Sequence, residues 1–156
     1  MGIDIRPPKL DDINAIAIAA NDPDVCKFMV DFFYPYNKDK GIEFLQHAID
    51  WFNAHTSCHF VITYLWTPIW IIWWEAHSWD SIEIGCWLWK KYWWKWYMWM
   101  AFDKLQAFLI WEYLNYRYIL AKADNQNIRS IKFLKKKWFK QIKQKGNLIY
   151  FVYTLK

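Results

Sequence analysis

The sequence predicts a mixed α/β domain, with a mostly antiparallel sheet flanked by helices. Three observations support this: short β-rich runs in the middle and at the end of the chain, helical stretches between them, and one helical stretch that joins two β-rich runs. A strand–helix–strand connection forces its two strands to run parallel, while the shorter turns elsewhere suit antiparallel pairs. With 156 residues, the chain has the length of one domain, spanning 1–156.

The N-terminal third alternates one strand with helices. A short apolar-polar alternation that stops at Pro7-Pro8 indicates an edge strand. An Asp pair then precedes a helical run ending near Asn21, in the manner of an N-capped helix. The expected elements are a strand over Ile3–Arg6 and helices over INAIAIAA, Val25–Phe33 and Lys38–Asn53, with a loop over Tyr34–Asn37.

The rest of the chain predicts a meander, a crossover and a final hairpin. The meander strands are Phe60–Leu65, Ile69–Ala76 and Ser81–Leu88, with the first turn at Thr67-Pro68. A helix over Tyr97–Tyr113, a strand over Tyr118–Ala123 and a helix over Asn127–Lys137 follow. The hairpin covers 139–155 around Lys145-Gly146-Asn147, because Gly and Asn tolerate positive φ.

Composition narrows the functional classes and holds one anomaly. The chain has 14 Trp and only 4 Gly, where average usage of about 7% predicts roughly 11 Gly. A net charge of +5 favours an anionic partner. An odd number of cysteines and a start without an apolar segment fit a cytoplasmic protein without disulfides. The uncharged stretch 51–74 is broken by polar residues and Thr67-Pro68, so we expect no transmembrane segment.

Two segments carry a resemblance. They are IEIGCWLWKKYWWKWYMWMA from Ile82 to Ala101 and DNQNIRSIKFLKKKWF from Asp124 to Phe139. Together they resemble the motifs of the GNAT acyl-CoA N-acyltransferases, in particular the branch that acetylates ribosomal-protein N-termini. That branch reads E-I-G-x-x-L, then Y-W-G-x-G-Y, then N-x-x-S-x-x-x-L-x-x-x-G-F. The resemblance implies the GNAT fold, acetyl-CoA as co-substrate and transfer of the acetyl group to an amine.

The resemblance also assigns a loop for the diphosphate of the co-substrate. A loop that enters a helix N-terminus can bind phosphates with free backbone N–H groups. Family members carry Gly in this loop, whereas this chain carries Trp94 and Trp96, and Trp138 stands where the family has Gly before Phe139. Trp73, Trp74 and Trp89 also fall where relatives commonly carry Gly. The expected loop residues are Tyr92, Trp93, Trp94, Lys95, Trp96 and Tyr97.

The remaining site residues follow from the same resemblance. Glu83 would be the general base, acting directly or through a water, unless it is simply an exposed strand carboxylate. Ser130 would protonate the leaving thiolate, since Leu134 stands where many members have Tyr. Asn127 would contact the pantetheine arm or only cap its helix. Trp87 and Leu88 would contribute backbone N–H groups to the acetyl carbonyl and the pantetheine amides.

Several other polar residues receive weaker interpretations. Lys90, Lys91 and Lys95 flank the loop and would either meet phosphates or face solvent. His55 and His59 are four residues apart but lack a third ligand at a suitable spacing, so we predict no metal site. Cys86 is expected to be a buried small residue rather than a nucleophile.

The leading hypothesis is therefore an acetyl-CoA-dependent N-acetyltransferase, in which a primary amine of a protein N-terminus or a small molecule attacks the thioester directly. The chain would act as a monomer or homodimer without nucleic acid. Two alternatives stay open. One is a GNAT scaffold whose loop tryptophans prevent CoA binding. The other is a membrane- or nucleic-acid-binding protein that uses the Trp- and Lys-rich run 87–99.

Overall fold

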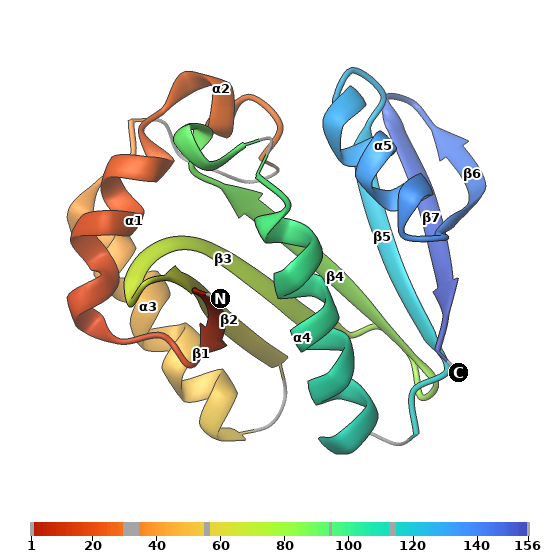
Figure 1. Ribbon diagram of the computed structural model, residues 1–156, viewed down its shortest axis with the longest axis horizontal. Coiled ribbons are helices and arrows are strands. Elements are labelled where there is room, and N and C mark those ends of the chain that lie inside the picture. Colours follow the sequence, from red (N-terminus) through yellow and green to blue (C-terminus); the bar gives the residue numbers. More distant parts are fainter. Residues whose placement is uncertain (1, 30–34, 55–56, 94, 113–114, 156) are drawn as a thin grey trace.

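The computed structural model describes residues 2–29, 35–54, 57–93, 95–112 and 115–155. These residues form one seven-stranded sheet in the order β1-β2-β3-β4-β5-β7-β6, with helices packed on it (Figure 1). Only β4 and β5 pair in parallel among the described strands, so the predicted mixed, mostly antiparallel sheet is confirmed. The strands are β1 Ile3–Arg6, β2 Ser57–Tyr64, β3 Thr67–Ala76, β4 Ser81–Leu88, β5 Tyr118–Asp124, β6 Lys140–Lys145 and β7 Leu148–Thr154.

The helices cover both faces of this sheet. They are α1 Ile13–Ala20, α2 Pro23–Cys26, α3 Lys38–Ala54, α4 Tyr97–Glu112 and α5 Ile128–Lys136, with 3₁₀ turns η1 Leu10–Asp12 and η2 Lys90–Tyr92. The ring of Phe60 meets Phe108 of α4 at 5.0 Å between centroids, and the next ring, His59, meets Phe44 of α3 at 5.3 Å. Because successive strand residues point to opposite faces, α3 and α4 lie on opposite faces of the sheet.

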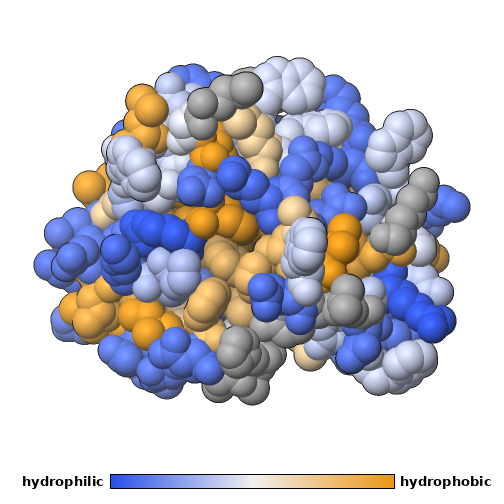
Figure 2. Space-filling view, turned by 60° about the horizontal axis from the view of Figure 1, so that its bottom comes forward, coloured by the Kyte–Doolittle hydropathy of each residue, from blue (hydrophilic) through white to orange (hydrophobic). Residues whose placement is uncertain are grey.

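The apolar periodicity of each element explains this packing. Leu45 and Ala48 of α3 and Ala101, Phe102, Leu105 and Leu109 of α4 are buried at helical spacing. The middle strands are buried on both faces, which suits their near-continuous apolar runs. Large hydrophobic side chains are exposed as well, and Figure 2 shows orange surface among hydrophilic residues on one face of the molecule.

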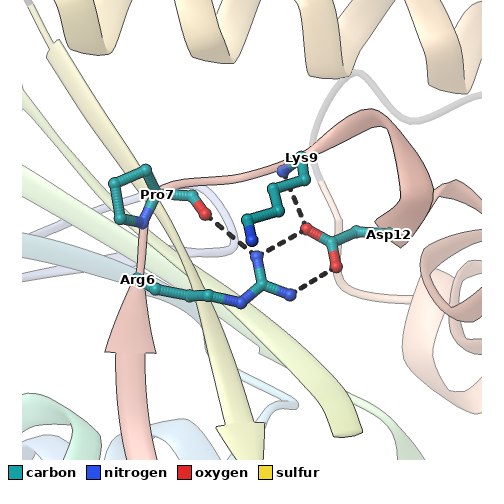
Figure 3. Close-up of polar contacts among 4 residues, drawn as sticks. All are labelled: Arg6, Pro7, Lys9 and Asp12. Carbon is teal, nitrogen blue, oxygen red and sulfur yellow. Dashed lines mark hydrogen bonds and ion pairs between the residues drawn. The ribbon is translucent and has the colours of Figure 1, made fainter. Parts of the chain in front are cut away.

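A partly buried ion pair joins β1 to the first helices. The guanidinium of Arg6 donates to both carboxylate oxygens of Asp12, at 2.9 and 2.6 Å, and the Lys9 backbone N–H donates to the same carboxylate at 2.8 Å (Figure 3). Arg6 also donates to the Pro7 carbonyl at 3.0 Å. The hydrogen bond to Asp12 raises the pKa of Arg6. These bonds satisfy the buried carboxylate and fix the chain entering α1.

The parallel pairing of β4 with β5 ends early, and this opens the sheet. β4 and β5 are in register from Ser81↔Tyr118 to Ile84↔Ala121. Beyond that point β4 runs on beside β3 to Leu88, while β5 runs on beside β7 to Asp124. The two strands therefore diverge at their carboxyl ends and leave room for a site between them.

Two local predictions need correction. The helix predicted over Val25–Phe33 is instead the short α2, which begins at Pro23 because the Asp22 side chain accepts from the Asp24 N–H at 3.0 Å and Pro suits the first helical position; 30–33 lie outside the described residues. The predicted break at Thr67-Pro68 is also wrong. The turn is at Leu65-Trp66, and Pro68 pairs with Thr63 beside a register shift, where a strand tolerates Pro.

Candidate functional site

A cavity of about 350 Å³ lies at the divergent ends of β4 and β5. Four parts of the chain line it: the end of β4, the loop with the first turn of α4, the first turns of α5, and the segment around α2. The described lining residues are Asp24, Val25, Phe28, Met29, Cys86, Trp87, Leu88, Tyr92, Trp93, Lys95, Trp96, Tyr97, Met98, Trp99, Asn127, Arg129, Ser130, Lys132, Phe133 and Lys136.

This cavity gathers most of the residues that the sequence singled out. Trp87, Leu88, Tyr92, Trp93, Lys95, Trp96, Tyr97, Asn127 and Ser130 all line it. Trp94 lies outside the described residues. Residues more than 40 positions apart in the chain thus meet because β4 and β5 are adjacent and each leads into a helix beside the opening.

Glu83 is absent from the described cavity lining. It lies on β4 before the strands diverge, and its Oε1 accepts an ion pair from Lys122 Nζ of β5 at 2.8 Å. The Glu83 side chain is 18% exposed, and its hydrogen bond and charge raise the pKa of Lys122. The ion pair joins Glu83 of β4 to Lys122, one residue past the end of the parallel pairing on β5, so the carboxylate of the predicted base is already paired with a lysine.

Asn127 and Ser130 form the start of α5. The Asn127 side chain accepts from the Ser130 backbone N–H at 3.2 Å, which is an N-cap. Both side chains also line the cavity, and the cap therefore holds Ser130 at the cavity wall. The capping role of Asn127 is confirmed, and contact with a pantetheine arm stays a prediction.

Trp93 and Arg129 bridge the two walls of the opening. The Trp93 indole N–H donates to the Leu88 carbonyl at 2.9 Å, and the Arg129 guanidinium lies 3.2 Å from the centre of the Trp93 ring. Partial burial lowers the pKa of Arg129. Sequence reasoning did not single out Arg129. Its place between the predicted Asn127 and Ser130 is a signal that could have found it, because that helix turn faces the site.

The mouth of the cavity is basic. Lys95, Arg129, Lys132 and Lys136 line it beside one carboxylate, Asp24, which Lys90 holds in an ion pair. Lys91 instead lies over the Trp89 ring, 3.4 Å from its centre. Of the flanking lysines, then, Lys95 is the one at the cavity.

The charge of the mouth follows from a division along the chain. All 15 Asp and Glu residues fall within 1–124, and nine of the 20 Lys and Arg residues fall within 125–156. The C-terminal segment therefore carries only positive charges, and α5 brings several of them to one side of the opening. A phosphorylated ligand would be attracted to that side.

Two further expectations concern cysteine and metals. Cys86 is exposed and lines the cavity, so the expectation of a buried residue is wrong; beyond Ile84 the strand has lost its β5 neighbour, which leaves this side chain open to the cavity. Within the described part of the chain, no three His, Cys, Asp or Glu side chains are grouped to hold a metal ion. No helix built from the described residues is long and apolar enough to cross a membrane.

The described strands form a mixed sheet that opens beside the parallel pair β4 and β5, and the first turns of α4 and α5 lie at the opening. The family model for the acetyltransferase (GNAT) domain matches residues 3–140. The chain belongs to this family, and the resemblance stated from the motifs is confirmed. No curated protein gives a significant match to the sequence.

Solved structures agree in fold over nearly the whole chain. A ribosomal L7/L12 α-N-protein acetyltransferase, RimL, in complex with coenzyme A has a TM-score of 0.88 at 11% identity, covering 99% of this chain and 95% of that one. The microcin C7 self-immunity acetyltransferase MccE, in complex with acetyl-CoA and AMP, has a TM-score of 0.85 at 14% identity. The match covers 98% of this chain and 92% of that one. A GNAT-family acetyltransferase from Bacillus anthracis has a TM-score of 0.82 at 17% identity, and the match covers 99% of this chain and 95% of that one.

Proposed function

We propose that this protein transfers an acetyl group from acetyl-CoA to a primary amine. The observation that carries the proposal is the cavity between the diverging ends of β4 and β5, lined by the residues of both motif segments. Structures similar to this chain, RimL and MccE, contain coenzyme A and acetyl-CoA respectively. Family membership supports the acyl transfer, and the acceptor amine is part of the proposal.

The residues present fit a co-substrate with an anionic and an apolar part. The first turn of α4 lies at the cavity, and a helix N-terminus offers N–H groups and a positive dipole end to phosphates. Lys95, Arg129 and Lys136 add positive charge there, while Met98, Trp99 and Phe133 give an apolar wall. The thioester supplies an activated acyl group, and the chain's task is to hold it and to move protons.

Ser130 and Glu83 are proposed to move those protons. Ser130 is held at the cavity wall by the Asn127 cap, where its hydroxyl would donate a proton to the departing thiolate. Glu83 would accept a proton from the ammonium, through a water because its side chain does not reach the described cavity lining. With direct attack by the amine, no covalent intermediate with the protein is needed.

The end of β4 is proposed to orient the acyl group. Past Ile84 the strand is no longer paired with β5, and its end lines the cavity through Cys86, Trp87 and Leu88. N–H groups of Trp87 or Leu88 would donate to the acetyl carbonyl and to amides of the pantetheine arm. The Trp93 indole already uses the Leu88 carbonyl, which fixes that end of the strand.

The first experiment measures thermal unfolding with and without acetyl-CoA. A ligand at a hundred times its Kd adds about 2.7 kcal/mol, a shift of a few degrees for a domain of this size. Free-thiol release with a panel of amines then tests transfer, and Ser130→Ala and Glu83→Gln should each slow it by about 10²-fold or more. No shift and no thiol release with any amine would contradict the proposal.

A second candidate is a scaffold that no longer binds CoA. The observation that favours it is Trp96, which lines the cavity at its mouth and packs edge-on against Trp99 at 5.5 Å. If these rings block the diphosphate, the double variant Trp94→Gly/Trp96→Gly should bind acetyl-CoA where the unchanged chain does not. Equal affinity in both chains would remove this candidate.

The cytoplasm is the proposed location. No disulfide links Cys26, Cys58 and Cys86, which suits a reducing compartment. Peptide mapping of the purified protein under non-reducing conditions should find no disulfide.

A further inference from the structure

The turn between β2 and β3 has a backbone that its residues do not suit. Tyr64 pairs with Thr67, so Leu65 and Trp66 form a two-residue hairpin turn, and their φ angles are 48° and 70°. Turns with positive φ at both central positions favour Asn or Asp first and Gly second. The Trp66 side chain is 88% exposed, so no burial of its ring offsets the backbone conformation.

The end of α5 repeats the pattern. The Trp138 N–H donates to the Lys135 carbonyl at 3.1 Å and the Phe139 N–H donates to the Leu134 carbonyl at 3.0 Å, the two bonds of a Schellman motif. In that motif the residue after the cap takes the left-handed conformation and is usually Gly. Here it is Trp138, with φ of 66° and a side chain 82% exposed.

Some other tryptophans in the same chain have packing roles, and others, such as Trp79 and Trp111, are exposed but do not have a positive φ. Trp74 is fully buried, and Trp93 donates a hydrogen bond and stacks on Arg129. Among the tryptophans that the structure describes, Trp66 and Trp138 differ from the rest because each combines a positive φ with an exposed ring. The composition agrees with tryptophan standing at glycine positions, because the chain has 14 Trp and only 4 Gly.

We propose that the protein made in its own cell carries glycine at positions 66, 94, 96 and 138. The sequence shows tryptophan there because codons that the source cell decodes as glycine have been translated as tryptophan. UGA is a codon that different translation systems read as stop, tryptophan or glycine, so one reassignment accounts for all four positions. The assignment of glycine at positions 66 and 138 rests on the positive φ angles of these two residues. Positions 94 and 96 rest on the proposed function, since a phosphate-binding loop needs close backbone approach that a tryptophan ring would obstruct.

Mass spectrometry of the protein purified from its source cells decides the assignment. Trypsin releases the peptides 92–95 and 96–104, and their fragment ions report positions 94 and 96; a chymotryptic digest reports 66 and 138. Glycine masses at 66 and 138 are the expected result. Tryptophan at 66 and 138 would overturn the proposal, and tryptophan confined to 94 and 96 would overturn its extension to the loop.

A pair of recombinant chains tests the physical argument. The quadruple variant Trp66→Gly/Trp94→Gly/Trp96→Gly/Trp138→Gly should unfold several degrees higher than the printed chain and bind acetyl-CoA at least about tenfold more tightly. The matched control Trp93→Gly should unfold at a lower temperature, because that ring is packed. A quadruple variant that unfolds lower than the printed chain would count against the proposal. A stabilised quadruple variant without acetyl-CoA binding would leave the glycine assignment standing and remove the proposed function.

Discussion

The β2–β3 hairpin carries a tryptophan near each end, and the two have opposite environments. At the open end, Trp73 is half-buried and stacks on His59, with ring centroids 6.0 Å apart and planes 9° apart. At the closed end, Trp66 is 88% exposed and holds a φ of 70°. The same residue type is thus favoured by packing at one end and disfavoured by the backbone at the other.

The contrast teaches which part of a residue the fold uses. Around His59 the fold uses the side chains: Trp51 and Phe44 of α3 cover the imidazole from one direction and Trp73 from another. At Leu65-Trp66 the fold uses only the ability to adopt positive φ. Substitutions at the two ends should therefore change stability with opposite signs.

The largest change in stability is expected when the pH is lowered, through His59 at the packed end of the hairpin. Burial lowers the pKa of His59 to about 4, below the ordinary value of 6.5. Between these two pH values His59 is protonated in the unfolded chain but not in the folded one. The free energy of unfolding is therefore highest above pH 6.5 and decreases as the pH falls to about 4, by roughly 3 kcal/mol in all. Urea unfolding at pH 4 to 7 measures this, and His59→Phe should flatten the same interval. An unchanged slope in that variant would contradict the assignment.

The next effect concerns the space above Gly85. A Cβ built on Gly85 would overlap the Trp73 indole, which lies across it from the neighbouring strand. Gly85→Ala should therefore cost about 1–3 kcal/mol by overpacking. In combination with Trp73→Ala the penalty should largely vanish, and the double-mutant cycle gives the coupling. Additive effects would show that the two positions do not compete for space.

At the turn the sign should reverse. Trp66→Gly is expected to stabilise the protein by about 1 kcal/mol, because Gly adopts φ of 70° without steric cost. Trp66→Ala should gain less, since its Cβ keeps the strain. Chemical denaturation of the three chains measures the order, and a loss of stability in Trp66→Gly would mean that the exposed ring contributes more than the backbone.

The smallest effect is expected at the other hairpin. Gly146, between β6 and β7, has φ of 58° and open space around it. Gly146→Ala should destabilise by somewhat less than about 1 kcal/mol, because the strain at positive φ is partly offset by lower entropy of the unfolded chain. A neutral or stabilising result would break the parallel between the two turns.

Much of the fold could be predicted because its cues are local. The apolar spacing of Lys38–Ala54, the Gly146-Asn147 turn and the Asn127 cap each depend on a few neighbouring residues. One prediction failed where distant residues decide: Pro68 fits a strand because β2 supplies a register shift beside it. The ion pair of Glu83 with Lys122 also could not be predicted, because it depends on the pairing of β4 with β5.

The sequence by itself determined the order of the elements, the motif residues of the site and the positive charge of 125–156. Only the tertiary structure decided that β4 and β5 part after Ile84, that Arg129 stacks on Trp93, and that Trp66 and Trp138 occupy glycine conformations. The physical reason is that hydrophobic period and charge are properties of a segment, whereas strand divergence, ring stacking and a backbone angle depend on what the rest of the chain packs against it.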